Sequence, residues 1–426
     1  MKQIKSSLLI LLTSLTLNAF GQSQNTTFDK IYNLVEQKNF FKAVETYDAQ
    51  KGELTTVHQK VIEAFLDNAF NRLQASNKKI IQLIQAGSNL PDSLMLKLYK
   101  TIEDNAVKLF NYKEAKSAIL TIMANYKRLL SEDDRNGMEN NLKIWTALEH
   151  EPKQQVKIKE ANCLKMEKDK AGLNNLKVSS GKNTVDFIFD TGANLSTTSE
   201  TAAKQLGMKI IPVDIEVGTI TGETAQAQLA VCPVMTLGNI EIRNAVFLVL
   251  KDEGLAFPQI DYRINGILGF PVIAALKEIQ TTQDGYFIVP EEETKFEARS
   301  NLAMDGLTPL VLINDKHFTF DTGADHTILY SPYYSGNRQE IESNYSQTVI
   351  SFGGAAGVRE FKGYKIDFSF DFNGKNMTLK NVSLLTSSLE EKSSGIFGNI
   401  GQDLIKRFAK MTLNFNQMFI KFDSYN

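Results

Sequence analysis

The first third of the chain has the hydrophobic spacing of amphipathic helices. From about residue 27 to 149, apolar residues recur every three or four positions, as the 3.6-residue helical period requires. Short polar breaks at residues 38–39, at Gly52 and at residues 87–92 interrupt this pattern. The spacing predicts an all-α domain of several helices over residues 22–150.

Three short segments of this helical region resemble one another. Each runs from an Asn to an Ala over five residues, and the alanines are Ala43, Ala75 and Ala115. Their offsets of 32 and 40 residues bracket the period of about 34 residues that is typical of helix-pair repeats. The region therefore resembles tetratricopeptide repeats. An ordinary helical bundle packed on the next domain explains the same periodicity equally well.

The pattern changes beyond Pro152. Short runs rich in β-branched and aromatic residues, such as 184–189 and 364–372, alternate with Gly, Asn and Asp. Runs of this kind, bounded by turn residues, predict strands. Because this part of the chain also repeats itself, we expect an all-β region of two lobes, residues 151–289 and 290–426.

The repeat is clearest in the sequence Phe-Asp-Thr-Gly-Ala, which occurs at residues 189–193 and 320–324. A glycine-rich stretch follows each Asp after 32 or 33 residues, and an apolar-apolar-Gly step ends 79 or 77 residues after it, at Gly269 and Gly398. One Asp-Thr-Gly is a weak signal, since Asp and Gly are common in turns. Two copies that lead to the same landmarks indicate two copies of one fold unit.

Asp190 and Asp321 are the candidate catalytic pair, one from each half. Two neighbouring carboxyls can share one proton, so that one activates a water molecule while the other protonates the carbonyl oxygen of a peptide bond. Like charges a few ångströms apart cannot both ionise, which raises one pKa of the pair. The expected site therefore exists only where the two halves meet.

The residues around this pair have expected supporting roles. Glycine leaves room for backbone N–H groups beside the carboxylates, and threonine hydroxyls can tie two loops together. Alanine cannot donate to a carboxylate as Ser or Thr would, which predicts a pH optimum of roughly 5 to 6.5. The expected supporting residues are Thr191, Gly192, Ala193, Thr322, Gly323 and Ala324. The flap candidates are Gly218, Gly222, Gly353, Gly354 and Gly357, for which plain hairpin turns are the alternative.

These motifs resemble those of retroviral-type aspartic proteases, with two subunits fused in one chain as in pepsin-like enzymes. The second half is the more similar, in its segments 321–329, 353–361 and 396–415. The first half departs at Asn194, and neither half has the Tyr-bearing flap of pepsins. The resemblance covers residues 170–426. It implies a catalytic Asp dyad, a threonine grip between the loops and flaps over an extended peptide.

Composition argues against several other classes of protein. Lys and Arg number 47 against 49 Asp and Glu, so the chain lacks the basic surface of a nucleic-acid binder. No His-Glu-x-x-His, Cys-x-x-Cys, Gly-x-Ser-x-Gly or phosphate-loop pattern occurs, and we expect neither a metal nor a cofactor. Cys163 and Cys232 either form one disulfide or remain free buried thiols.

The N-terminus predicts export. Two lysines and an apolar run over residues 8–17 precede small residues at Ala19 and Gly21, which predicts a secretory signal over residues 1–21. The run is shorter than a typical membrane span, and a retained leader acting as a tether is the alternative. Asn194 lies in a glycosylation acceptor pattern beside the candidate site. A glycan there would crowd the cleft, which favours an exporting cell that does not glycosylate, and hence the bacterial periplasm or the cell exterior.

The sequence thus predicts an exported aspartic endopeptidase with a peptide or protein substrate. Both half-sites lie in one chain, so we expect a monomer. The helical domain offers a surface for a protein partner. The alternative is a peptide-binding or scaffolding protein whose protease domain no longer cleaves, since the residues of a site can outlast its activity.

Overall fold

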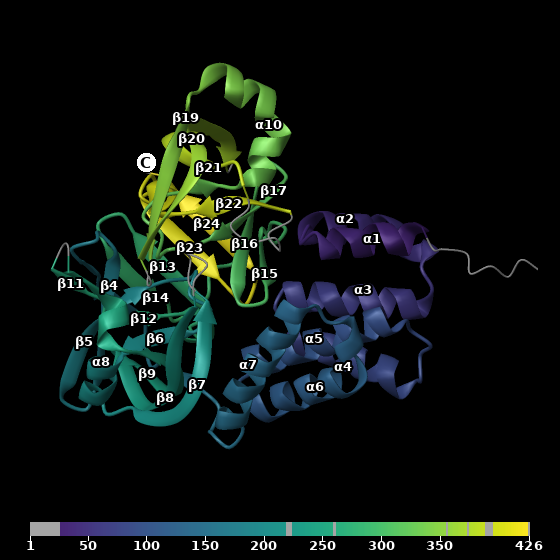
Figure 1. Ribbon diagram of the computed structural model, residues 1–426, viewed down its shortest axis with the longest axis horizontal. Coiled ribbons are helices and arrows are strands. Elements are labelled where there is room, and N and C mark those ends of the chain that lie inside the picture. The colour runs from purple at the N-terminus through teal and green to yellow at the C-terminus, as the bar shows by residue number, and fades with distance from the viewer. Residues whose placement is uncertain are drawn as a thin grey trace, which may run out of the picture.

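The protein consists of a helical region followed by a β-rich region, as the hydrophobic pattern predicts (Figure 1). The computed structural model describes residues 26–218, 224–258, 261–354, 357–372, 375–387 and 395–424. The expected secretory signal lies outside the described residues. Among the helices described, none is long and apolar enough to cross a bilayer.

In the helical region, successive helices pair as hairpins. Each helix buries the apolar residues that recur at helical spacing, and in α3 these include Val61, Ile62, Phe65 and Leu66. The helices are α1 (Thr26–Glu36), α2 (Phe40–Gln50), α3 (Thr56–Ala69), α4 (Leu73–Gln85), α5 (Asp92–Lys108), α6 (Tyr112–Asn125) and α7 (Glu132–Leu148), with the short 3₁₀ turns η1 (Lys51–Glu53) and η2 (Lys127–Leu129).

The hairpins α1–α2, α3–α4 and α5–α6 share one turn geometry. Each turn contains one residue with positive φ, and the next residue's N–H donates to the carbonyl five positions before it. This geometry makes Ala43, Ser76 and Ala115 equivalent, and all three are fully buried. The expected match of Ala75 is therefore wrong by one residue. Ser76 takes the place of the alanine in the second hairpin, and its hydroxyl donates to the carbonyl of Ala64 over 2.8 Å. Because this residue is polar, the repeat is not evident from the sequence. The positive-φ residues are Lys38, Asn71 and Phe110.

The β-rich region contains two large sheets. The first has the strand order β1-β9-β6-β12-β5-β4-β8-β7, with β3 on β4 and a further pairing of β8 with β9. Its strands are β1 (Gln155–Lys157), β3 (Glu167–Lys168), β4 (Asn174–Ser180), β5 (Asn183–Phe189), β6 (Ser196–Ser199), β7 (Lys209–Gly218), β8 (Thr224–Leu237), β9 (Ile240–Leu250) and β12 (Gly266–Leu268). We call this sheet, with helices α8 (Glu200–Gln205) and α9 (Phe270–Ala275), the first lobe.

The second large sheet has the order β15-β16-β17-β22-β18-β21-β20-β19. Its strands are β15 (Leu302–Asp305), β16 (Thr308–Ile313), β17 (Lys316–Phe320), β18 (Ile328–Leu329), β19 (Gln347–Gly354), β20 (Gly357–Phe372), β21 (Lys375–Leu385) and β22 (Ile396–Ile400). With helices α10 (Ser331–Asn344) and α11 (Gln402–Ile405), it forms the second lobe.

The two lobes repeat one topology. In the first, β5 forms a hairpin with β4, runs parallel to β12, and β12 runs antiparallel to β6, which is parallel to β9. In the second lobe, β17 likewise forms a hairpin with β16 and runs parallel to β22. Strand β22 runs antiparallel to β18, which is parallel to β21. The repeated sequence motif therefore corresponds to a repeated fold unit.

A third sheet connects the lobes. Strand β13 from the first half pairs antiparallel with β23 from the second, with Ile279 opposite Leu413. The sheet has the order β2-β14-β13-β23-β24. Its strands are β2 (Asn162–Lys165), β13 (Glu278–Thr282), β14 (Tyr286–Val289), β23 (Lys410–Asn414) and β24 (Phe419–Asp423); β10 (Ala256–Phe257) and β11 (Tyr262–Arg263) form a separate small ribbon, beside the 3₁₀ turn η3 (Asp252–Leu255).

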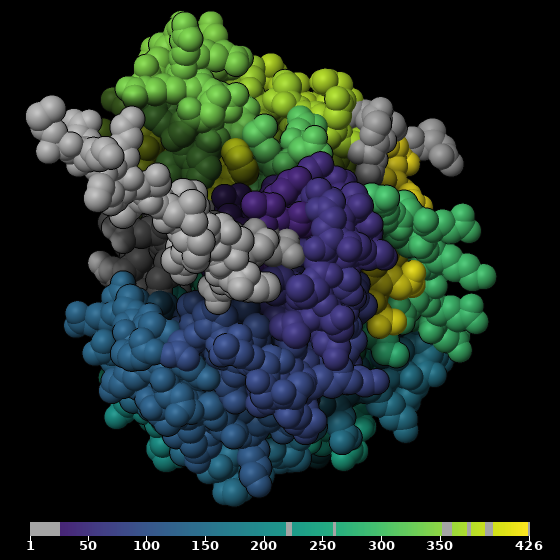
Figure 2. All heavy atoms as spheres, turned by 90° about the vertical axis from the view of Figure 1, so that its right-hand side faces the viewer, coloured from purple at the N-terminus to yellow at the C-terminus, as the bar shows by residue number. Residues whose placement is uncertain are grey.

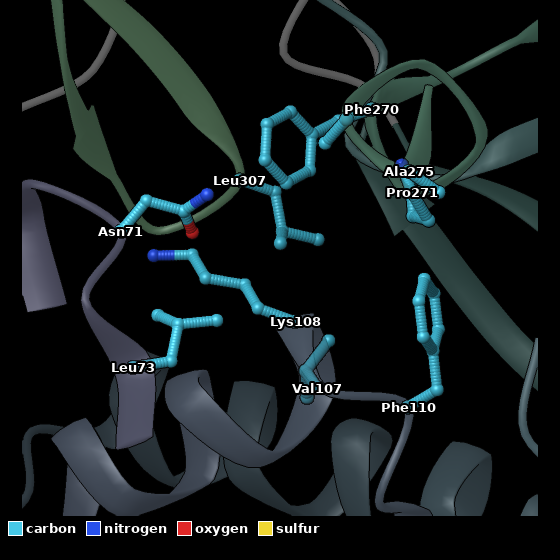
Figure 3. A pocket seen from close by; sticks show the side chains of 10 residues that line it. Asn71, Leu73, Val107, Lys108, Phe110, Phe270, Pro271, Ala275 and Leu307 are labelled. Carbon is cyan, nitrogen blue, oxygen red and sulfur yellow. The ribbon is translucent and has the colours of Figure 1, made fainter. Parts of the chain in front are cut away.

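The helical region contacts both lobes. Lys38 Nζ lies 2.5 Å from Asp305 Oδ1 of the second lobe, and Asn140 Nδ2 donates to the carbonyl of Glu216 of the first lobe over 2.8 Å. Asn71 Nδ2 donates to the carbonyl of Phe415, just after β23 of the connecting sheet, over 2.8 Å. Figure 2 shows the purple and blue helical atoms spread below the green second lobe. A cavity of about 100 Å³ remains between these parts (Figure 3). Lys108 crosses it and pairs with Asp104 over 2.6 Å, while Phe110, Phe270 and Leu307 supply apolar walls.

Candidate active site

Asp190 and Asp321 occupy equivalent positions at the ends of β5 and β17. The preceding residues, Phe189 and Phe320, are each 1% exposed and pack in the cores of their lobes. Each Asp therefore directly follows a residue whose position is fixed by close packing. The backbone N–H of Asp190 donates to the carbonyl of Leu268 over 3.1 Å, and that of Asp321 to Ile400 over 3.0 Å. Both Asp residues keep partly exposed surface.

Thr191 and Thr322 bind the two Asp loops to each other. The N–H of Thr191 donates to the hydroxyl of Thr322, and the N–H of Thr322 donates to that of Thr191, each over 3.0 Å. Each hydroxyl then donates across the interface, Thr191 to the carbonyl of Phe320 (2.9 Å) and Thr322 to that of Phe189 (3.0 Å). Both threonines are 1% exposed, so these four bonds are shielded from water.

The glycines of the two loops face the opposite carboxyl. An ideal Cβ built on Gly192 would lie 2.5 Å from Cγ of Asp321, and one on Gly323 would come closer still to Cγ of Asp190. A side chain at either position would therefore collide with the other lobe's carboxyl. This close approach brings the two carboxyls to one place, where the halves meet.

The carboxylates accept hydrogen bonds from their own loops. Gly192 N–H donates to Asp190 Oδ1 over 2.8 Å; Gly323 and Ala324 N–H donate to Asp321 Oδ1 over 2.8 and 3.1 Å. Burial raises the pKa of Asp190 well above its usual range, and the negative charge of Asp321 raises it further. The pair therefore favours a state in which Asp190 holds a proton.

The two alanines act through their backbones. The carbonyl of Ala193 accepts from the N–H of Phe270, and that of Ala324 from the N–H of Gln402, each over 2.8 Å. These bonds join the Asp loops to the first residues of α9 and α11. All eight expected dyad and supporting residues thus lie in the two Asp loops, and these loops meet.

The pairing of glycines that we expected at the third landmark of the sequence repeat is wrong. Gly269 was expected to match Gly398, but its N–H donates to the hydroxyl of Ser196 just as the N–H of Gly401 donates to Thr327 (3.0 and 3.2 Å). Gly401 is therefore the counterpart. The apolar-apolar-Gly step misled because Asn399 replaces the first apolar residue in the second lobe. The shared pattern is Gly-x-x-Gly followed by a helix, at residues 266–269 and 398–401.

Several buried polar residues of the site were given no role in it by the sequence analysis. The hydroxyls of Ser196 and Thr327 lie six residues beyond each Asp and fix the glycines described above. Gln402 donates to the carbonyl of Thr322 over 2.9 Å, and Asn399 donates to Asp321. The equal spacing of Ser196 and Thr327 from the two Asp residues is the signal that could have found them.

The flap candidates lie at two hairpins, one in each lobe. Gly218 ends β7 and pairs with Thr224 of β8, while Gly354 ends β19 and pairs with Gly357 of β20. Gly353 also belongs to β19, and Gly222 lies outside the described residues. In Figure 1 the arrowhead of β7 points toward the second lobe. Their action as flaps stays a prediction.

Other expected chemistry has no partner at this site. Cys163 and Cys232 are both free thiols, so the disulfide alternative is wrong. The alternative of free buried thiols holds for Cys232 only, because Cys163 is exposed. Across the described ranges, no group of three or more His, Cys, Asp or Glu side chains is arranged to hold a metal ion. His326 is exposed in the loop after Asp321, with Nε2 3.1 Å from Asp325.

Comparison with known proteins gives one family match. Residues 175–272 match a family model described as aspartyl protease. The match includes Asp190 and the first Gly-x-x-Gly pattern, and it falls on the half that had seemed less similar. It extends over less than half of the chain and does not include Asp321. No curated protein matches the chain.

Two solved structures share a weak likeness with the chain. One is basic 7S globulin from soybean, at 13% identity and a TM-score of 0.39. The other is conglutin gamma, a basic 7S globulin from lupine, at 11% identity and a TM-score of 0.39. Each likeness covers 63% of this chain and 95% of the other.

Proposed function

We propose that this chain is an aspartic endopeptidase in which Asp190 and Asp321 hydrolyse peptide bonds through an activated water. The observation that carries the proposal is the reciprocal bonding of Thr191 and Thr322. It joins loops from two lobes at the one point where each contributes a carboxyl, and the aspartyl protease match around Asp190 supports it.

The chemistry asks little beyond this geometry. Of two close carboxyls, one holds a proton and the other is ionised. The ionised group takes a proton from water as it attacks the peptide carbonyl carbon, and the protonated group gives its proton to the carbonyl oxygen. The raised pKa of Asp190 supports this singly protonated state.

The wider proposal follows the resemblance of the motifs. The lobes would act as two fused subunits of a retroviral-type protease, with the β7–β8 and β19–β20 hairpins as flaps over an extended peptide. Export by the N-terminal signal, a periplasmic or extracellular location and a monomeric state belong to the same proposal. The helical hairpins, which resemble tetratricopeptide repeats, would hold a protein partner or the substrate.

The test is incubation of the purified full chain with a diverse peptide mixture, followed by mass spectrometry of the products. We expect internal cleavage at a limited set of sequences, with Asp321→Asn protein as the blank. Peptides that bind but stay intact would instead support the alternative, a peptide-binding protein that no longer cleaves.

A further inference from the structure

Asp321 has a polar neighbour beyond its own loop. Asn399 Nδ2 donates to Asp321 Oδ2 over 3.0 Å, and Asn399 Oδ1 accepts from the hydroxyl of Thr319 over 2.6 Å. Asn399 is 5% exposed, so the amide is held out of bulk water by its neighbours. Because an ionised carboxylate only accepts hydrogen bonds, a donor at this place stabilises its charged form.

The first lobe has two isoleucines in place of this polar pair. Asn399 of β22 lies opposite Thr319 of β17, and Ile267 of β12 lies opposite Ile188 of β5 in the same arrangement. The antiparallel neighbours agree, since Asn399 pairs with Ile328 and Ile267 with Thr197, each seven residues beyond its Asp. An isoleucine has no donor, so Asp190 receives no equivalent bond from these two positions.

We propose that Asn399 is a positioning residue that keeps the negative charge of the dyad on Asp321 and leaves the shared proton on Asp190. The inference deepens the proposed function and rests on it. It assigns fixed roles to two carboxyls that the sequence repeat makes look interchangeable: Asp321 is the general base and Asp190 the general acid. The burial that raises the pKa of Asp190 acts in the same direction.

The reaction step follows from these roles. One O–H bond of water breaks as its proton passes to Asp321, and the water oxygen forms a bond to the peptide carbonyl carbon. The proton of Asp190 passes to the carbonyl oxygen, which gives a neutral gem-diol. Asp321 then returns a proton to the amide nitrogen, the C–N bond breaks, and Asp190 regains its proton from a gem-diol hydroxyl, which leaves a carboxylic acid and an amine.

The pH profile of kcat/KM for Asn399→Leu tests this assignment. Loss of the donor destabilises ionised Asp321, so the acidic limb should move to higher pH by about one unit. Ile267→Leu makes the matched change in the first lobe and should leave the limb in place. An unmoved limb in Asn399→Leu, or a shift to lower pH, would overturn the proposal.

A second variant covers the risk that Asn399→Leu fails to fold. Thr319→Val removes only the hydroxyl that holds the Asn399 amide, and we expect a smaller shift of the acidic limb in the same direction. If Thr319→Val folds and its limb does not move, Asn399 needs no anchor and its role as a positioned donor is wrong.

A measurement without substrate separates this inference from the proposed function. In full-length protein with carbon-13 in its Asp carboxyls, the signals lost in Asp190→Asn and Asp321→Asn identify the pair. The two signals should titrate in separate steps, with the Asp190 signal at the higher pH, and Thr319→Val or Asn399→Leu should bring the two together. The reverse order would overturn the assignment. If these results appear but no peptide is cleaved, only the proposed function fails.

Discussion

Asp190 is placed where its charged form is costly. The carboxyl is largely buried against the opposite loop and lies beside a second carboxyl, and both effects raise its pKa. The folded protein therefore binds the Asp190 proton more tightly than the unfolded chain does. This contribution to stability is fully present below the unfolded pKa and is lost as pH rises through the raised folded pKa.

The first prediction concerns the stability of Asp190→Asn. Asn has the same shape and no charge, so at pH 8 the variant should melt above the wild type, by about 2 °C or more. The gain should shrink as pH falls toward 4, because the wild-type Asp190 is then protonated. Thermal melts followed by circular dichroism across pH test this. Asp214→Asn, at an exposed position of the same lobe, should show no such gain; a lower melting temperature for Asp190→Asn at pH 8 would contradict the account.

The second prediction concerns the alanines after each Asp-Thr-Gly. Neither side chain can donate to a carboxylate, so the acidic limb of kcat/KM should lie high and the optimum at roughly pH 5 to 6.5. Ala324→Ser adds a donor that favours ionisation of Asp321, the proposed general base, and should move the acidic limb to lower pH. Ala193→Ser adds one beside Asp190, the proposed general acid, and should move the alkaline limb to lower pH. Ala193→Gly and Ala324→Gly serve as controls without a donor. A wild-type optimum below about pH 4, or serine variants with an unchanged limb, would rule this out.

At this scale the sequence predicts the residues of the loops better than the residues that tune them. Asp, Thr and Gly are visible because the chemistry and the backbone demand those residue types twice. Asn399 is not visible, because one Asn in a strand has no pattern until the fold sets it beside Asp321. The same Asn breaks the apolar step and shifts the apparent repeat to Gly398.

Among the elements, the edge strand β7 has an unusual partner. Asn140 of α7 donates from Nδ2 to the carbonyl of Glu216 over 2.8 Å and accepts the N–H of Glu216 at Oδ1 over 2.9 Å. One side chain thus replaces the two bonds of a neighbouring strand, close to the end of β7 at Gly218. The helical region is thereby attached to the edge of the β7–β8 hairpin, which contains the flap candidate Gly218.

The third prediction tests this attachment. Asn140→Ala leaves the N–H of Glu216 without its acceptor, so its hydrogen exchange should quicken by about fivefold to tenfold, as expected for one lost bond of about 1 kcal/mol. Hydrogen exchange read by mass spectrometry on peptides that contain residue 216 measures it. Asn136→Ala, one turn earlier on the exposed face of α7, is the matched control. Equal exchange in the two variants would show that Asn140 does not hold the strand.

Elements were the most predictable level, for a physical reason. Apolar spacing reports which faces are buried, so the helices and the strands Asn183–Phe189 and Gly357–Phe372 follow from it. The helix turns at Asn71 and Phe110 did not, since non-glycine residues in the left-handed conformation carry no strong sequence signal. Which edge of a sheet meets which helix depends on long-range packing. A single residue such as Asn140 gives no sequence signal of that contact.

At the scale of the whole molecule, the two lobes are joined covalently and by the sheet that pairs β13 with β23. Fusion supplies both half-sites at fixed proximity, a role that dimerisation plays in single-lobed relatives of the proposed class.

The fourth prediction is that specific activity stays constant on dilution. Activity should be measured over a hundredfold range of concentration, with sedimentation to report the oligomeric state. A steep loss of activity on dilution would mean that the lobes pair between chains.

Sequence alone predicts this organisation as far as the repeat is visible. The duplicated motif implies two lobes with one site between them, and the structure has two lobes of one topology. The sequence says nothing of how the helical hairpins sit against both lobes. That arrangement arises from isolated contacts such as Asn71 with Phe415, which no periodic pattern encodes.

The central claim is that one site is built from two halves, and the fifth prediction addresses it directly. Cleavage of one identified peptide should be measured for wild type, Asp190→Asn, Asp321→Asn and the double variant, with folding checked by circular dichroism. Each single variant should lose about three orders of magnitude or more in kcat/KM, and the double variant should lose little more, because the two carboxyls act as a unit. Near-wild-type turnover in either folded single variant would contradict the account.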